Sequence, residues 1–291
     1  MDASTAVLLT IVTAATPLLL AAMGELVAER SGVLNLGVEG MMVMGAVAGF
    51  GAAFLTGSPY VGVIASIIAG MAMALLFGFL TLTLVSNQVA TGLSLTLLGL
   101  GLSGLLGESF VGEPGVRLPK LFGIDMLILF SFILTAAVAY VLFRTKAGLV
   151  IRAVGDSHSS AHALGYRVIW VRYLCVLFGG ACAGLAGGYL SLVYTPQWIE
   201  NMTAGRGWIA LALVVFSSWM PWRVVAGAYL FGAISILSYT VQTFALGIPS
   251  QLLSSLPYLV TIAALVVISA NRRLTRTNAP ASLGQAFVPD R

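Results

Sequence analysis

The chain has 291 residues, of which 59% are hydrophobic and only 8% are charged. A soluble domain is about 45–50% apolar and roughly 25% charged, so 14 basic and 10 acidic side chains are too few to cover a water-exposed surface. This composition excludes a soluble enzyme, a disordered chain and a nucleic-acid-binding domain, because the net charge of +4 comes from basic residues scattered at segment ends. We therefore expect an integral membrane protein that lies mostly in the lipid bilayer.

Apolar segments long enough to span a membrane follow one another along the chain. Charged residues are absent between Glu39 and Glu108 and between Arg223 and Arg272, and Gly, Pro and polar turns divide both stretches. The second expected span begins with a polar, glycine-rich stretch and could be broken or re-entrant, and the seventh is short. The fold class expected is an all-α bundle of about nine (8–10) transmembrane helices. These spans are Thr5–Leu26, Val33–Leu55, Tyr60–Val85, Val89–Phe110, Ile124–Phe143, Tyr173–Tyr194, Trp208–Met220, Val224–Leu246 and Leu252–Ala270.

Basic residues in the loops predict the orientation of the chain. The loop 144–172 contains five basic residues and one acid, and the tail 271–291 contains a second basic group. The positive-inside rule places both on the cytoplasmic side and the N-terminus outside. No basic residue precedes the first apolar run, so we expect a retained span rather than a secretory signal. The whole chain, 1–291, is expected to form one transmembrane domain.

The polar stretch GELVAERSGVLNLGVEG, residues 24–40, is the first candidate site. Asn35 and Glu39 are four apart and would share one face of a helix. A carboxylate within the membrane is costly unless it is paired or hydrated, so Glu39 is assigned to the translocation pathway, with Arg30 or a backbone terminus as its partner. The alternative is that Glu39 only caps a broken helix. Asn87 and Gln88, at the break between the third and fourth spans, are assigned to the same pathway.

The cytoplasmic loop contains a second candidate, a short helix over Ser157–Leu164. Asp156 or Ser157 can cap its start and Gly165 can end it. Its small residues are expected to point outward, which suits docking into a groove of a partner protein, and the alternative is a solvated connector. The small residues are Ser159, Ser160, Ala161 and Ala163.

A third polar segment is expected outside the membrane. Tyr194, Gln197 and Trp198 could form an outer gate, or they could belong to the aromatic belt that is common at membrane interfaces. Catalysis and a metal site are not expected. Asp156 and the two histidines, His158 and His162, lie on one short loop without an oxyanion hole, a nucleophile elbow or a metal-ligand pattern.

Glycine spacing and the remaining rare residues add structural predictions. Gly180, Gly184 and Gly188 repeat every four residues and predict close packing between helices, as do Gly45 and Gly49. Cys175 and Cys182 are about 10 Å apart along a helix, too far for a disulfide, and are expected to be buried. Neither of the two lysines lies in a P-loop frame, so we expect no ATP hydrolysis by this chain.

Four of these segments resemble the permease subunits of ABC importers, in the branch that includes branched-chain amino acid, ribose and nucleoside permeases. They are residues 24–45, 152–165, 179–188 and GRGWIALA at 205–212, and the resemblance extends over roughly Thr16 to Ser269. The string ERSGVLNLGVEG looks most like the nucleoside and simple-sugar group.

The resemblance implies a type II importer-like permease in a bacterial plasma (inner) membrane. It implies a dimeric pore with a second, different permease, a cytoplasmic ATPase that carries ATP and Mg²⁺, an external solute-binding protein, and no cofactor on this chain. The coupling helix that the ATPase grips would comprise Asp156, Ser157, His158, Ser159, Ser160, Ala161, His162, Ala163, Leu164 and Gly165. Relatives commonly have Asn-Pro where this chain has Ser157-His158.

The solute expected from the resemblance is a nucleoside, and a simple sugar such as ribose or galactose is the alternative. An ion-coupled secondary transporter is a less favoured alternative, since such proteins place an ion site in each of two repeats. Glu39 and Glu108 could be offered for that role, although no second copy of the Glu39 motif is present. A structural membrane subunit without transport is the remaining alternative.

Overall fold

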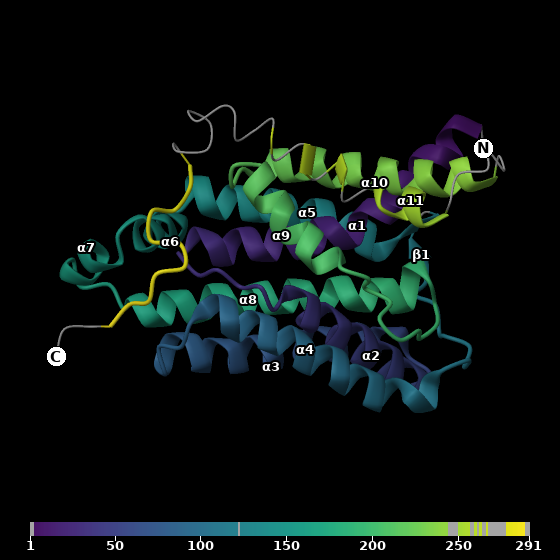
Figure 1. The fold of residues 1–291 in the computed structure, drawn as a ribbon, viewed down its shortest axis with the longest axis horizontal. Coiled ribbons are helices and arrows are strands. Elements are labelled where there is room, and N and C mark those ends of the chain that lie inside the picture. The colour runs from purple at the N-terminus through teal and green to yellow at the C-terminus, as the bar shows by residue number, and fades with distance from the viewer. Residues whose placement is uncertain are drawn as a thin grey trace.

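The computed structural model describes residues 3–121, 123–243, 250–256, 259–260, 262–263, 266 and 278–288. This part of the chain is almost entirely helical (Figure 1). The long helices are α1 (Ala3–Arg30), α2 (Val38–Thr56), α3 (Pro59–Gly78), α4 (Gln88–Gly107), α5 (Met126–Arg144), α8 (Val168–Tyr189) and α10 (Pro221–Thr243). The shorter ones are η1 (Phe79–Thr83), η2 (Glu108–Phe110), α6 (Lys146–Asp156), α7 (His158–Ala163), η3 (Leu190–Tyr194), α9 (Arg206–Phe216) and α11 (Ser250–Ser254).

Seven helices in the described chain are long and apolar enough to cross a membrane, and they correspond to the expected spans one to six and eight. The seventh expected span is α9, a short apolar helix of 11 residues. Most of the ninth, Leu252–Ala270, lies outside the described residues. The prediction of an all-α, multi-pass membrane protein is therefore confirmed. The outer surface agrees, because large apolar side chains such as Leu97 and Ile64 are exposed, as lipid contact requires.

The helices run along the long axis of the molecule, which separates two ends (Figure 1). One end carries α6, α7 and the C-terminal segment 278–288. The other carries the start of α1 and a two-residue antiparallel pair, β1 (Lys120–Leu121) with β2 (Ile124–Asp125). The loop 144–172 and the C-terminal segment thus share one end, as the charge pattern predicts, while the side of the membrane on which this end lies stays a prediction.

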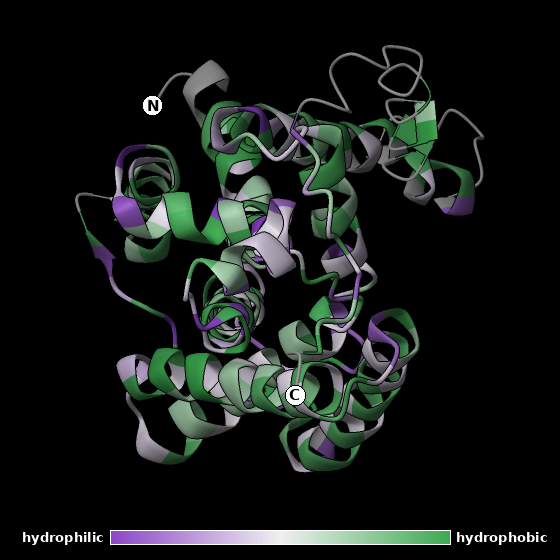
Figure 2. Cartoon of the chain, turned by 90° about the vertical axis from the view of Figure 1, so that its left-hand side faces the viewer, coloured by the Kyte–Doolittle hydropathy of each residue, from purple (hydrophilic) through white to green (hydrophobic). Residues whose placement is uncertain are grey.

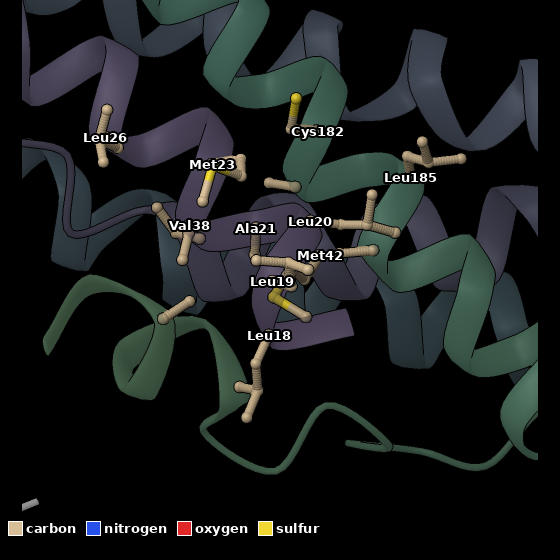
Figure 3. Close-up of a cluster of buried hydrophobic side chains, with 14 of the residues drawn as sticks. Leu18, Leu19, Leu20, Ala21, Met23, Leu26, Val38, Met42, Cys182 and Leu185 are labelled. Atoms are coloured by element: carbon tan, nitrogen blue, oxygen red, sulfur yellow. The ribbon is translucent and has the colours of Figure 1, made fainter. Parts of the chain in front are cut away.

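The core forms where α1, α2, α3 and α8 pack together, and Figure 3 shows side chains of α1, α2 and α8 meeting there. Figure 2, seen from the end with α7, shows a ribbon coloured mainly for hydrophobic residues. The predicted glycine packing is confirmed: a Cβ on Gly184 would lie 2.2 Å from Ser66 O in α3, and one on Gly45 would lie 2.3 Å from Gly184 O. Cys175 and Cys182 are free and buried, as expected.

Candidate functional site

The chain is irregular between α1 and α2, from Ser31 to Gly37. Asn35 lies in this break and not on α2, so the expectation that Asn35 and Glu39 share a helix face is wrong. The reason is local: Asn35 Oδ1 accepts a hydrogen bond from Gly37 N at 2.9 Å, a turn that competes with helix formation. The backbone N–H of Asn35 donates to Glu25 Oε1 at 3.3 Å, which ties the break to α1.

The break carries the chain back toward the middle of the membrane alongside α4. Leu34 N donates to Gln88 Oε1 at 2.8 Å at the start of α4. Further along, a Cβ on Gly99 would lie 2.7 Å from the Cα of Gly40. At about 1.5 Å per residue, Gly99 lies roughly 16 Å from Gln88 along the axis of α4. This is about half of a hydrocarbon core of ~30 Å, so α2 begins near mid-membrane.

Glu39, in the first turn of α2, is 2% exposed and holds the start of α9. One carboxylate oxygen accepts from Thr203 Oγ1 at 2.6 Å and from Gly205 N at 2.7 Å, and the other accepts from Gly207 N at 2.6 Å. A helix N-terminus has unpaired N–H groups and a partial positive charge, so a carboxylate satisfies both. Of the two partners expected for Glu39, the structure selects a backbone terminus and not Arg30.

Glycine is required on the α9 side of this contact. Gly205 has φ +81°, and a Cβ on Gly207 would lie 2.6 Å from the Cα of Glu39. The motif GRGW at 205–208 therefore serves two purposes, the left-handed turn before the helix and the close approach of its backbone to Glu39. As a result, two helices that begin inside the molecule, α2 and α9, meet with their N-termini together.

The other expected pathway residues lie in the break before α2 and at the start of α4, and they differ in exposure. Asn35 and Gln88 are buried, and Gln88 Nε2 has no hydrogen-bond partner within the described residues. Asn87 is exposed, and its side chain accepts from Ala90 N at 3.0 Å, which caps α4. A cavity of about 390 Å³ adjoins this cap, and four of its lining residues are polar. They are Ser86, Asn87, Thr91 and Ser94.

The three residues expected at an outer gate differ in their surroundings. Trp198 is buried and packs against Phe50, and a Cβ on Gly107 would meet its indole. The Tyr194 ring lies 5.6 Å from the guanidinium of Arg206 at the start of α9. Gln197 is exposed. Trp198 therefore packs between α2 and α4 near their C-terminal ends.

The short helix expected in the loop is α7, capped at both ends. Ser157 Oγ accepts from Ser160 N at 3.3 Å, which makes Ser157 the N-cap. At the other end Gly165 has φ +88°, and Tyr166 N donates to Ala161 O, as in a Schellman motif. The exposed residues are Ser159, Ser160, His162, Ala163 and Leu164.

Ala161 does not point outward as expected. Its side chain is 2% exposed and packs against Val154 of α6 and Val168 of α8. A helix of six residues gives too short a pattern for its buried face to be read from sequence, and every residue on this one is small or polar. The outward face is therefore formed by the other residues of α7.

Sequence reasoning missed a cluster at the end of α1. Glu29 and Arg30, the last two residues of α1, are buried. Trp219 Nε1 donates to Glu29 Oε2, and Arg30 donates to Trp219 O through Nη2 at 2.9 Å. Trp219 and Ser218 both have positive φ, so two neighbouring residues of α1 hold a strained turn after α9. The signal present was the pair of opposite charges directly after an apolar run.

Comparison with known proteins identifies the family. The family of branched-chain amino acid transport system permease components matches residues 7–268. A Haloferax volcanii protein described as a glucose ABC transporter permease is 39% identical, over 95% of each chain. A guanosine ABC transporter permease protein of Bacillus subtilis is 30% identical, over 94% of this chain and 93% of its own.

A solved structure also shares the fold. It is a metal-chelate-type ABC transporter in an inward-facing conformation, which matches 91% of this chain and 85% of its own with a TM-score of 0.56 at 18% identity. At this identity the likeness concerns the fold alone. The family match covers nearly the whole described helical domain, and the two relatives are similar over nearly their whole lengths. The chain belongs to the family of branched-chain amino acid transport system permease components and is a multi-pass ABC transporter permease subunit.

Proposed function

We propose that this subunit forms part of the translocation pathway of an importer that takes up a nucleoside. The observation that carries the proposal is the junction of α2 and α9 at Glu39. Irregular backbone at membrane depth is tolerated only where it is buried in protein or lines a cavity. Transporters use helices interrupted in this way to build solute sites near the middle of the bilayer.

Glu39 and Asn35 support the backbone beside this pathway and do not line it, because both are buried and hydrogen-bonded within the chain. Asn87 and the hydroxyl groups around it are better placed to face a solute, since they line a cavity beside the start of α4. Gln88 supports this position with a buried amide N–H that the described chain leaves without a partner.

Four partners complete the proposed importer. A cytoplasmic ATPase, which carries ATP and Mg²⁺, grips α7 as the coupling helix, and an external solute-binding protein delivers the solute. A second, different permease forms the other half of the pore. The bilayer surrounds both permeases. Support for the ATPase contact comes from the position of α7, which is short, capped and exposed at the end of the molecule (Figure 1).

A monosaccharide is the second candidate solute, and the 39% identity to a protein described as a glucose permease favours it. The 30% identity to a guanosine permease favours the nucleoside. Both solutes are uncharged and carry neighbouring hydroxyl groups, so the hydroxyl and amide side chains around Asn87 suit either one.

Uptake by the assembled importer tests the proposal. The chain, its second permease, the ATPase and the binding protein are reconstituted in liposomes, and entry of labelled guanosine and of labelled glucose is measured with and without ATP. We expect ATP-dependent guanosine uptake that excess glucose does not inhibit. Glucose uptake alone would select the second candidate. Uptake that follows an ion gradient without the ATPase would overturn the assignment to an ABC importer.

A further inference from the structure

The C-terminal segment 278–288 lies against the end of the molecule that carries α6 and α7 (Figure 1). It pairs through its backbone with two glycines, since Ser282 N donates to Gly155 O at 2.9 Å and Gly284 N donates to Gly32 O at 3.1 Å. Gly32 and Gly155 also lie close together, and a Cβ on Gly155 would collide with the carbonyl oxygen of Arg30. The segment is therefore joined to the point where α1 and α6 end.

Two buried arginines hold the same segment by its carbonyl groups. Arg30 Nη1 donates to Asn278 O, and Arg172 Nη1 donates to Gln285 O, each at 3.0 Å. Arg172, which is 1% exposed, also donates to Ser31 O at 3.2 Å, and its Nη2 lies 3.4 Å from His158 Nδ1. One guanidinium thus connects the end of α1, the C-terminal segment and α7.

The segment then reaches α7 itself. The ring of Phe287 packs against the rings of His158 and His162, with centroids 5.1 Å and 5.4 Å apart. These histidines are one helical turn apart, so a single ring contacts both. Phe287 also packs against the small cluster that buries Ala161.

An isolated helix of six residues is not stable in water, so the position of α7 depends on what it packs against. Below it, Ala161 presents only a methyl group to the cluster with Val154 and Val168. Above it, the ring of Phe287 contacts both histidine rings of α7.

We propose that residues 278–288 form a strap that fixes the orientation in which α7 meets the ATPase, and that Phe287 is its positioning residue. The proposal rests on the function proposed above, in which α7 is the coupling helix. Phe287 acts through His158 and His162 and leaves the other exposed residues, Ser159, Ser160, Ala163 and Leu164, accessible to the partner.

The test compares Phe287→Ala with Val288→Ala in the full importer. Val288 is 64% exposed and is the matched control. The readouts are the ATPase concentration needed for half-maximal binding to the permease and solute-stimulated ATP hydrolysis. We expect Phe287→Ala to weaken binding roughly threefold to tenfold, the range that loss of an aromatic contact produces. Val288→Ala should bind normally, and Phe287→Tyr should restore binding.

A double variant separates positioning from a general effect on the tail. If Phe287 acts through His162, the variant Phe287→Ala with His162→Ala should bind no worse than the poorer single variant. Additive losses, or normal binding and hydrolysis after deletion of residues 286–291, would overturn the strap. The deletion also covers the case in which one substitution is too mild.

Ala163→Glu, on the exposed side of α7, separates this proposal from the function on which it rests. If Ala163→Glu abolishes ATPase binding while Phe287→Ala leaves it normal, the strap is wrong and the coupling helix stands. If Ala163→Glu binds the ATPase normally, α7 is not the coupling helix and both proposals fail.

Discussion

Replacement of Glu39 tests the junction of α2 and α9 most directly. Glu39→Ala leaves two buried donors, Thr203 Oγ1 and Gly207 N, and one half-buried donor, Gly205 N, without an acceptor. Each buried unsatisfied donor costs about 1–3 kcal/mol, so the two buried donors alone should destabilise the start of α9 by about 2–6 kcal/mol. A whole domain is stable by only about 5–15 kcal/mol, and the N-terminal turn of α9 should therefore detach locally.

Glu39→Gln should destabilise the start of α9 less than Glu39→Ala does. Its carbonyl oxygen can still accept from Thr203 and Gly205, but its amide group faces the N–H of Gly207, and two donors then oppose each other. One lost acceptor should cost about 1–3 kcal/mol. We expect uptake to decrease from the unmodified chain to Glu39→Gln and further to Glu39→Ala. Glu200, an exposed acid in the loop before α9, provides the control, and Glu200→Ala should leave uptake unchanged.

Labelling of a cysteine in α9 reports the local opening. Ile209 is 8% exposed, so Ile209→Cys should resist a membrane-permeant maleimide in the unmodified chain and react in Glu39→Ala. Cys175 and Cys182 are replaced by alanine in all variants to remove background. Normal uptake together with an unreactive cysteine in Glu39→Ala would refute the reasoning, because the three donors would then have found other partners at no cost.

Three further predictions concern α7 and its surroundings. A cysteine at Ser159 should react with an impermeant reagent only from the cytoplasmic side, and labelling from outside would contradict the orientation. Ala161→Glu should bury a charge beneath α7 and cost several kcal/mol, so limited proteolysis should cut the loop faster than in Ala163→Glu, which keeps the packing. Burial and the Arg172 guanidinium lower the pKa of His158 from its usual 6.5. The contact between His158 and the Arg172 guanidinium should therefore be intact above pH 6.5 and lost as the pH falls through the lowered pKa of His158. ATPase binding should weaken on acidification, and it should weaken less in His158→Gln.

The parts of this structure that depend on neighbouring residues could be predicted from the sequence. The apolar segments indicate the spans, and Ser157 with Gly165 indicates a short capped helix, because caps and turns act within a few residues. The resemblance located the same two regions. Both are properties that a single stretch of chain carries by itself.

Contacts between distant segments could not be predicted in the same way. Glu39 reaches the start of α9, which is more than half the chain away, and no local pattern near Glu39 indicates which helix terminus it holds. Asn35 was assigned to a helix because its spacing from Glu39 fits one, whereas its own side chain bonds to Gly37 and keeps the chain irregular. Trp219, which joins α9 to Glu29 and Arg30, lies in a turn whose positive φ values only the folded chain imposes.

The junction at Glu39 has an electrostatic consequence for the buried carboxylate. Each helix N-terminus carries about half a positive charge, and two of them, from α2 and α9, lie against one carboxylate. The two half charges balance the single negative charge at this contact, so Glu39 needs no cationic side chain as its counter-ion inside the membrane. Arg206, between the two glycines that bind Glu39, directs its guanidinium to Met202 O and to the Tyr194 ring instead.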